Sequence, residues 1–202
     1  IRVRKLYRTR EKSLYIGSMN KGVYEYTQHK NQWKNYQSPG NRRANQIYAL
    51  KKDSHNRLLI GTLAGLFILE NNTLKKFSVN GFGVDRPVYC ILEDPQNRLW
   101  FGTDNGVVRW DGKTRRTYST AEGLIGHETN RAAAIADSKG RIWIGTNRSV
   151  SFYDEQFDNT EAYSPPPKVH FLSIEVSDAL IPFTDNMPVR LGYDNNTIAF
   201  LF

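Results

Sequence analysis

The chain has few of the residues that form disulfides or bind metals. It contains one cysteine, Cys90, so no internal disulfide can form, and this residue is expected to be a small buried hydrophobe. Its four histidines, His29, His55, His127 and His170, lack the HxH or HxxxH spacing of metal ligands. The sequence therefore predicts neither a disulfide framework nor a metal or other cofactor.

Long hydrophobic runs and acidic residues are also scarce. No stretch approaches the roughly 18 apolar residues of a membrane span, and no signal peptide is found. Lys and Arg number 28 against 20 Asp and Glu, which leaves a formal net charge of +8. A basic field favours an acidic partner. Because no helix, finger or stacking motif would present this charge to DNA or RNA, we predict no nucleic-acid binding.

The most informative feature that is present is a block repeated along the chain. Gly17, Gly61, Gly102 and Gly145 follow one another at intervals of 44, 41 and 43 residues. The segments around these glycines alternate with a period of two, which is typical of strands and not of helices. Such a repeat, built from short strands, predicts propeller blades of about four strands each. The block occupies residues 94–103 and 137–146, with a looser copy at 53–62 and a weak one that ends at 14–18.

One repeat can be divided into the strands of one blade. The best-preserved copy predicts an inner strand at 88–92, a turn at 94–97, a second strand at 98–103, a third at 107–110 and an outer strand around 116–118. Neighbouring blades bury one another's faces. Five large aromatic residues are therefore expected in packing between blades rather than at a ligand: Trp100, Trp110, Trp143, Phe67 and Phe152.

Two recurring positions have a structural interpretation. Arg57, Arg98 and Arg141 occupy one repeat position, where an arginine stem can cover apolar surface and its guanidinium can pair with a nearby acid. The repeat glycine, for example Gly102, is expected to allow close packing or a bend that a Cβ would obstruct.

Several segments match a known family in their order along the chain. In the third repeat these are Arg98-Leu99-Trp100-Phe101-Gly102-Thr103, Asp104-Asn105-Gly106-Val107 and Trp110-Asp111-Gly112-Lys113-Thr114, and in the tail they are residues 165–176 and 189–198. The repeat resembles the two-component regulator propeller repeats of large bacterial sensor proteins. The tail resembles the opening of the triple-tyrosine sandwich domain that follows such propellers.

The resemblance implies an all-β chain of about four β-propeller blades followed by the first strands of a β-sandwich. Propeller repeats are expected over residues 1–164, with blades at about 1–40, 41–82, 83–124 and 125–164, and a truncated triple-tyrosine domain over 165–202. In this family the ring usually has seven blades. We therefore expect a fragment of a larger ring, with exposed blade faces and strand edges that favour self-association.

The resemblance also implies a function. Members of this family are extracytoplasmic, periplasmic sensors of oligosaccharides released during polysaccharide breakdown. A membrane helix and a histidine kinase follow the sandwich. The chain is thus expected to be a ligand-sensing segment, and not itself an enzyme, of a membrane-anchored, homodimeric two-component sensor. Its partners would be an oligosaccharide, the remaining blades and the sandwich domain.

A ligand is expected on one face of the propeller. There the loops from an outer strand to the next inner strand meet the turns between second and third strands. Arginine offers forked donors to carboxylate or sulfate, and asparagine matches sugar hydroxyls, so the predicted ligand is an acidic or sulfated glycan, with neutral glycans left open. The candidate residues are Arg42, Arg43, Asn45, Arg86, Asn105, His127, Asn130, Arg131, Asn147 and Arg148.

Two other functions remain open at this point. A propeller glycosidase or lyase would need paired carboxylates, and Asp104, Glu122 and Glu128 could approach a common face, although nothing singles them out. A structural or protein-binding propeller would instead bind a protein partner and no glycan.

Overall fold

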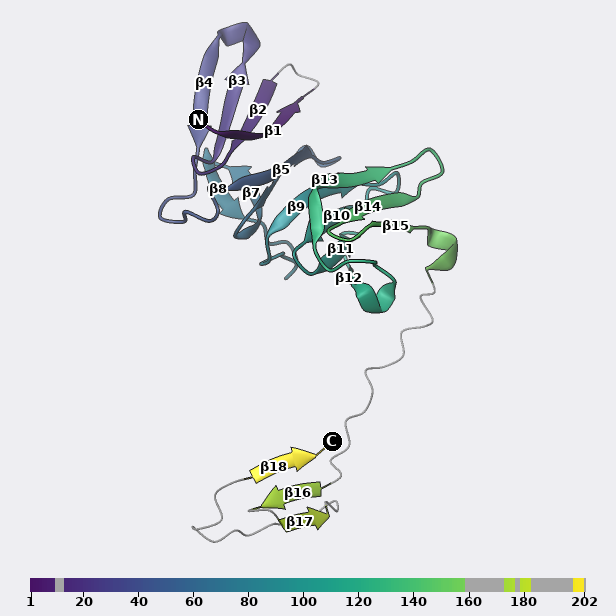
Figure 1. Cartoon of the computed structure of the whole chain (residues 1–202). Coiled ribbons are helices and arrows are strands. Elements are labelled where there is room, and N and C mark those ends of the chain that lie inside the picture. Colours follow the sequence, from purple (N-terminus) through teal and green to yellow (C-terminus); the bar gives the residue numbers. More distant parts are fainter. Residues whose placement is uncertain (10–12, 159–172, 177–178, 183–197, 202) are drawn as a thin grey trace. The chain divides into compact units, whose positions relative to one another are not determined.

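The computed structural model describes residues 1–9, 13–158, 173–176, 179–182 and 198–201. The chain divides into two compact units, Ile1–Asp158 and Asn159–Phe202. The first unit consists of four antiparallel sheets in chain order, a four-bladed propeller arrangement (Figure 1). Apart from three single-turn 3-10 helices, all regular structure in the described residues is strand, so the all-β prediction is confirmed.

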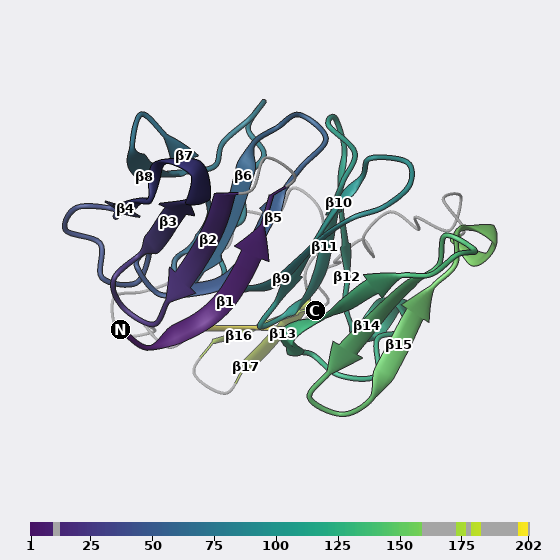
Figure 2. The same ribbon diagram turned by 90° about the horizontal axis from the view of Figure 1, so that it is seen from above.

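Each of the first three blades has four antiparallel strands that pair in chain order. Blade 1 contains β1 (Val3–Arg8), β2 (Ser13–Ser18), β3 (Val23–Thr27) and β4 (Gln32–Tyr36), with the turn η1 (Gln28–Lys30); blade 2 contains β5 (Ile47–Lys52), β6 (Leu58–Thr62), β7 (Gly65–Glu70) and β8 (Thr73–Lys76); blade 3 contains β9 (Val88–Glu93), β10 (Leu99–Thr103), β11 (Gly106–Trp110) and β12 (Arg115–Tyr118). The first strands of successive blades contact one another, and they are therefore the inner strands that the repeat predicts (Figure 2).

Blade 4 has three strands within the described residues: β13 (Thr129–Ala136), β14 (Ile142–Thr146) and β15 (Val150–Tyr153). The turn η2 (Thr120–Glu122) precedes this blade, and η3 (Glu155–Phe157) follows β15 where the earlier blades turn back into an outer strand. The end of the predicted blade, residues 159–164, lies outside the part of the chain that the structure describes.

The second unit contains one antiparallel sheet of three described strands. These are β16 (Ser173–Val176), β17 (Ala179–Pro182) and β18 (Ile198–Leu201), in the order β17-β16-β18. The tail segments 165–172 and 189–197, which carry much of the triple-tyrosine resemblance, lie outside the described residues.

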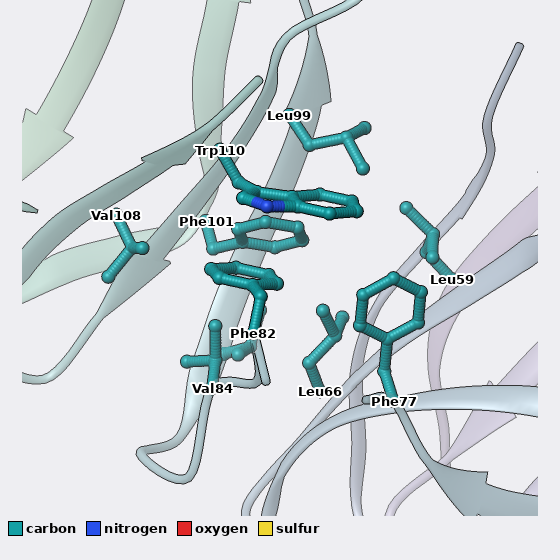
Figure 3. Packing of buried hydrophobic residues seen from close by; sticks show 10 residues of the cluster. Leu59, Leu66, Phe77, Phe82, Val84, Leu99, Phe101, Val108 and Trp110 are labelled. Atoms are coloured by element: carbon teal, nitrogen blue, oxygen red, sulfur yellow. The ribbon is translucent and has the colours of Figure 1, made fainter. Parts of the chain in front are cut away.

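Aromatic side chains fill the spaces between blades, as the repeat predicts. Phe82 and Trp110 stack with ring centroids 4.6 Å apart, and Phe77 contacts both rings edge-on (Figure 3). Trp100, Trp110 and Phe67 are at most 5% exposed. Phe152 differs from the expectation: it packs on the half-buried Trp143 but remains 50% exposed on the outward side of blade 4.

The repeat glycines permit the close approach expected of them. A Cβ on Gly61 would lie 2.6 Å from the carbonyl oxygen of Val88, and one on Gly102 would lie 2.6 Å from Oγ1 of Thr129 and would overlap the sulfur of Cys90. The inner strand of the next blade therefore packs directly against the backbone of the second strand. Cys90 is 4% exposed, as predicted, and burial raises the pKa of its thiol to about 11.

The recurring arginine pairs with the recurring aspartate of its own turn, as predicted. The carboxylate of Asp94 accepts hydrogen bonds from the backbone N–H of Arg98 (2.8 Å), from Nε of Arg98 (2.7 Å) and from Nε1 of Trp100 (2.8 Å). The same pairing joins Asp137 to Arg141 and Trp143, and Asp53 to Arg57. One carboxylate thus fixes both the turn and the following strand in three of the four blades.

Candidate ligand-binding face

Backbone hydrogen bonds bring the two predicted sets of loops together. The turn between the second and third strands of a blade bonds to the connection that leads into the next blade. The pairs are Gly22 N–H to Asn45 O (3.0 Å), Leu66 N–H to Val84 O (2.9 Å) and Gly106 N–H to His127 O (2.6 Å). In blade 4, Asn147 N–H donates to Glu128 O (2.9 Å), in the connection that leads into its own inner strand. These turns and connections together are called the loop face below.

A hydroxyl at the end of each second strand fixes the turn that follows. Thr62 Oγ1 donates to Gly65 O (2.9 Å), and Thr103 Oγ1 donates to Gly106 O (2.8 Å). In blade 4 the glycine position is Ser149, yet Thr146 Oγ1 still donates to its carbonyl (2.9 Å). The substitution therefore leaves the turn intact, and all these turns present their central side chains from a rigid base.

Two hollows on the loop face adjoin each other between blades 1 and 2. Their volumes are about 590 and 370 Å³, within the range of small-ligand sites. Both are lined by Asn20, Lys21, Arg42 and Gln46, and these four residues define the Lys21–Arg42 groove. Arg2 and Tyr24 complete the larger hollow.

The electrostatics of this groove are one-sided. Among the described residues, its lining contains Lys21 and Arg42, with Arg2 in the larger hollow, and no aspartate or glutamate. All three cations are exposed, and Asn20 and Gln46 beside them can donate and accept hydrogen bonds. The groove can therefore bind an anionic group through charge-assisted hydrogen bonds and neighbouring hydroxyls through side-chain amides.

Two of the predicted site residues belong to this groove, but in different ways. Arg42 lines both hollows. Asn45 also lines the smaller one, yet it is 8% exposed: its Oδ1 accepts from Ser38 N–H (2.8 Å) and its Nδ2 donates to Ser38 O (3.0 Å). Asn45 thus closes the loop that forms the wall, and its amide is already occupied.

Two predicted residues lie at the junction of blades 2 and 3, and a third, Arg43, lies at the junction of blades 1 and 2. Arg86 and Asn105 line a third hollow of about 260 Å³. Arg86 pairs with the carboxylate of Asp104 at 3.4 Å, which partly neutralises it. Arg43 reaches from the previous connection to donate to Leu63 O (3.3 Å), so its guanidinium ties a connection to a turn.

The remaining five predicted residues lie at the junction of blades 3 and 4. Asn130 donates from Nδ2 to Thr146 O (2.8 Å), and Arg131 lies over the ring of Tyr48. His127, Asn147 and Arg148 have exposed side chains. The ten residues therefore share the loop face, but the structure distributes them over separate positions rather than one pocket.

Sequence reasoning missed Lys21, Asn20 and Gln46 as site residues. They lie in the loops assigned to this face. Lys21 and Gln46 are neither arginine nor asparagine, and Asn20 is an asparagine that the candidate set omits. Their common signal is position, because Lys21 lies in the turn and Gln46 in the connection that the backbone bonds bring together.

Two of the three carboxylates named as catalytic candidates, Glu122 and Asp104, have other roles in the structure. Glu122 caps η2 by accepting from the backbone N–H and the hydroxyl of Ser119, and these bonds lower the pKa of its carboxyl group. Asp104 pairs with Arg86. The residues that the structure describes contain no group of three or more His, Cys, Asp or Glu that could hold a metal ion. No described helix has the length and apolarity needed to span a membrane.

Comparisons with known proteins agree with the propeller repeat. Residues 83–105 match the family described as two component regulator propeller. The fold is similar to the extracellular domain of a hybrid two component system from B. thetaiotaomicron, with a TM-score of 0.58 and 22% identity over 74% of this chain and 21% of that one. It is also similar to virginiamycin B lyase from Staphylococcus aureus, with a TM-score of 0.54 and 12% identity over 75% of this chain and 55% of that one.

These likenesses establish the propeller fold and leave the ligand undefined. At such identities a shared fold does not carry a shared activity. The chain spans about a fifth of the length of the B. thetaiotaomicron domain (21%). No curated protein matches the sequence.

Proposed function

We propose that the chain is a ligand-sensing segment of the extracytoplasmic, periplasmic region of a bacterial two-component sensor, and that its loop face binds an acidic or sulfated oligosaccharide. The propeller repeat at residues 83–105 and the likeness to a hybrid-system extracellular domain support the sensor assignment. The observation that carries the ligand is the Lys21–Arg42 groove, where two exposed cations and two amides line one hollow without an acid among the described residues.

The proposal includes a larger ring around these blades. The two end blades expose large apolar side chains on their outward sides: Leu6 (58%) and Trp33 (57%) in blade 1, and Ile135 (63%) and Phe152 (50%) in blade 4. Apolar surface of this kind is normally covered. Further blades of the same polypeptide, to the seven usual in such rings, would cover both sides.

The second unit is proposed to be the start of a triple-tyrosine sandwich. Its three-stranded antiparallel sheet is compatible with one layer of such a domain. A homodimeric, membrane-anchored parent with a kinase beyond this chain follows from the sensor proposal. In that parent, ligand binding at the loop face would change how the propeller packs against its neighbours.

Calorimetry on the 202-residue chain tests the ligand, with a sulfated tetrasaccharide and a neutral tetrasaccharide as probes. The double variant Lys21→Ala, Arg42→Ala should weaken binding of the sulfated probe by about a hundredfold or more, since each of the two lost charge-assisted hydrogen bonds contributes roughly 1.5–3 kcal/mol. The matched control is Arg8→Ala, Lys139→Ala, which removes the same charge. Both residues are exposed, and they lie at the end of β1 and just after β13, away from the loop face. This control should leave the affinity within about twofold.

The outcomes separate the parts of the proposal. Equal binding of both probes, with no effect of either double variant, would retain an oligosaccharide sensor and overturn the acidic ligand and the groove. No binding of any saccharide would overturn oligosaccharide sensing by this chain and favour the protein-binding scaffold.

A further inference from the structure

Four side chains from four different inner strands meet at the loop-face end of those strands. The guanidinium carbon of Arg4 (β1) lies 4.5 Å from the ring centroid of Tyr48 (β5), and that of Arg131 (β13) lies 4.8 Å from the same ring. Tyr89 (β9) contacts Tyr48 edge-on with ring centroids 5.2 Å apart. These four residues are called the channel cluster below.

Irregular strand pairing places these residues. The register of the inner strand shifts by one residue near its start in the first three blades, and Arg4, Tyr48 and Tyr89 are the extra residues. A bulge of this kind re-aims one side chain away from the alternation of the strand. In β13 the shift is longer, between Thr129 and Ala134, and it contains Arg131. The first three residues each lie 13 positions before the repeat glycine, and Arg131 lies 14 before it.

Backbone strain accompanies the last of these irregularities. Ala132, directly after Arg131, has φ +55°, in the left-handed region that a residue with a Cβ rarely adopts. Strain of this kind persists only where the surrounding structure holds it, and it is concentrated at functional sites. The strained residue thus lies next to the arginine that β13 contributes to the cluster.

The two arginines of the cluster differ from several other arginines of the propeller in having no paired carboxylate among the described residues. Arg57, Arg98 and Arg109 each pair with a carboxylate within 3.0 Å. Within the described part of the chain, neither Arg4 nor Arg131 lies within ion-pair distance of a carboxylate. Two positive charges therefore share one aromatic ring, and no carboxylate of the described residues pairs with either of them.

One hydrogen-bond donor in the cluster is left over. Nη1 of Arg4 is buried and has no hydrogen-bond partner among the residues that the structure describes. Buried donors of charged groups are nearly always paired, because leaving one unpaired costs its full desolvation penalty. Burial, followed by the charges of Glu128 and Asp104, raises the pKa of the Tyr89 phenol.

We propose that the channel cluster is a subsite for a single anionic group, a carboxylate or a sulfate, held between Arg4 and Arg131. The ring of Tyr48 orients both guanidinium groups, and the bound anion accepts the hydrogen bond that Nη1 of Arg4 lacks. Under the proposed function, on which this assignment rests, the bound carboxylate or sulfate belongs to an acidic sugar. A free inorganic anion could offer the same group.

Binding measurements on the 202-residue chain at constant ionic strength test this subsite. The probes are inorganic sulfate, glucuronate and a sulfated disaccharide, with glucose as the uncharged comparison. Arg131→Met and Arg4→Met should each weaken sulfate binding about fivefold or more, and the double variant should abolish it. Tyr48→Phe keeps the ring and should bind normally. Arg8→Met, at the other end of β1, is the matched control and should bind within about twofold of the parent chain.

Each outcome decides something. Anion binding that is unaffected by Arg131→Met would overturn the subsite, and this exposed residue provides the test even if Arg4→Met does not fold. Failure of the parent chain to bind any of the three anions would overturn it as well. Sulfate binding that depends on both arginines, without binding of any saccharide, would support the subsite and contradict the proposed function. Saccharide binding that neither arginine variant weakens would support the proposed function and contradict the subsite.

Discussion

Replacing Asp94 by alanine should destabilise the propeller more than any other single change to a repeat turn. The Asp94 side chain is fully buried and accepts four hydrogen bonds, among them those from Nε of Arg98 and Nε1 of Trp100. Trp100 is 2% exposed, so its indole N–H would be left without a partner. Removing one partner of a buried ion pair costs about 3–5 kcal/mol, and the orphaned donor is part of that cost.

One compensation keeps the expected loss toward the lower end of that range. Arg98 also donates to Glu155 at 2.7 Å, so its charge is not left unpaired. We therefore expect the free energy of unfolding to fall by about 3 kcal/mol, measured by urea unfolding followed by tryptophan fluorescence. Asp94→Asn should lose more than half as much, because its amide turns one acceptor into a donor that faces another donor.

A second turn provides the control for burial. Asp137 makes the same bonds to Arg141 and Trp143, but its side chain is 23% exposed. Asp137→Ala should therefore be clearly milder than Asp94→Ala. If Asp94→Ala lowers the free energy of unfolding by less than about 1 kcal/mol, or if both variants lower it equally, burial of the aspartate does not set the cost of removing it.

Three further predictions concern packing, reactivity and pH. Gly102→Ala should lower the free energy of unfolding by about 1–3 kcal/mol in the same assay, because its Cβ would overlap Cys90 and Thr129. Cys90, whose pKa is raised from 9.0 to about 11, should react with a thiol reagent at pH 8 about a hundredfold more slowly in the native chain than in urea; equal rates would contradict its burial. Hydrogen bonding by the hydroxyl of Thr114, first among several causes, lowers the pKa of Asp111 from 3.8 to about 2, so its contribution to stability is complete above about pH 4 and is lost as the pH falls toward 2. Asp111→Asn should reduce the slope of stability against pH in that window.

Local regularities of the sequence are sufficient to predict most of the propeller. The spacing of the repeat glycines predicts the number of blades, and period-two alternation predicts the strand order. The two loop sets of the loop face follow from that order. The pairing of Asp94 with Arg98 is also local, because the two residues flank one turn. These features depend on residues within one repeat.

The features that sequence reasoning missed depend on contacts between repeats. Alternation assigns a residue to one side of a strand, and a bulge breaks that assignment, so the meeting of Arg4 and Tyr48 could not be predicted. The end of blade 4 is also held by contacts with another repeat. Asp158 accepts from Arg109 and from Tyr118 of blade 3, two contacts that span 49 and 40 residues. No local pattern signals such a contact.

The positions of the predicted site residues illustrate the same limit. Arg42 and Asn45 are three residues apart in one loop, but one lines the groove with an exposed guanidinium and the other is bonded through both amide atoms to Ser38. Residue type and position in the loop predict the same role for both residues. What separates them is the path of the loop, which brings Ser38 back to Asn45.

The proposal that the loop face binds an acidic glycan is tested most directly by locating the bound glycan on the propeller. Backbone amide chemical shifts of the isotopically labelled 202-residue chain, recorded during titration with a sulfated tetrasaccharide, would map that position. If the glycan binds the Lys21–Arg42 groove, the shifted amides cluster on the loop face, in the turn at residues 19–21 and the connection at residues 38–46. Shifts centred on the opposite turns, at residues 94–98 and 137–141, would contradict the proposal, as would a spectrum that does not change.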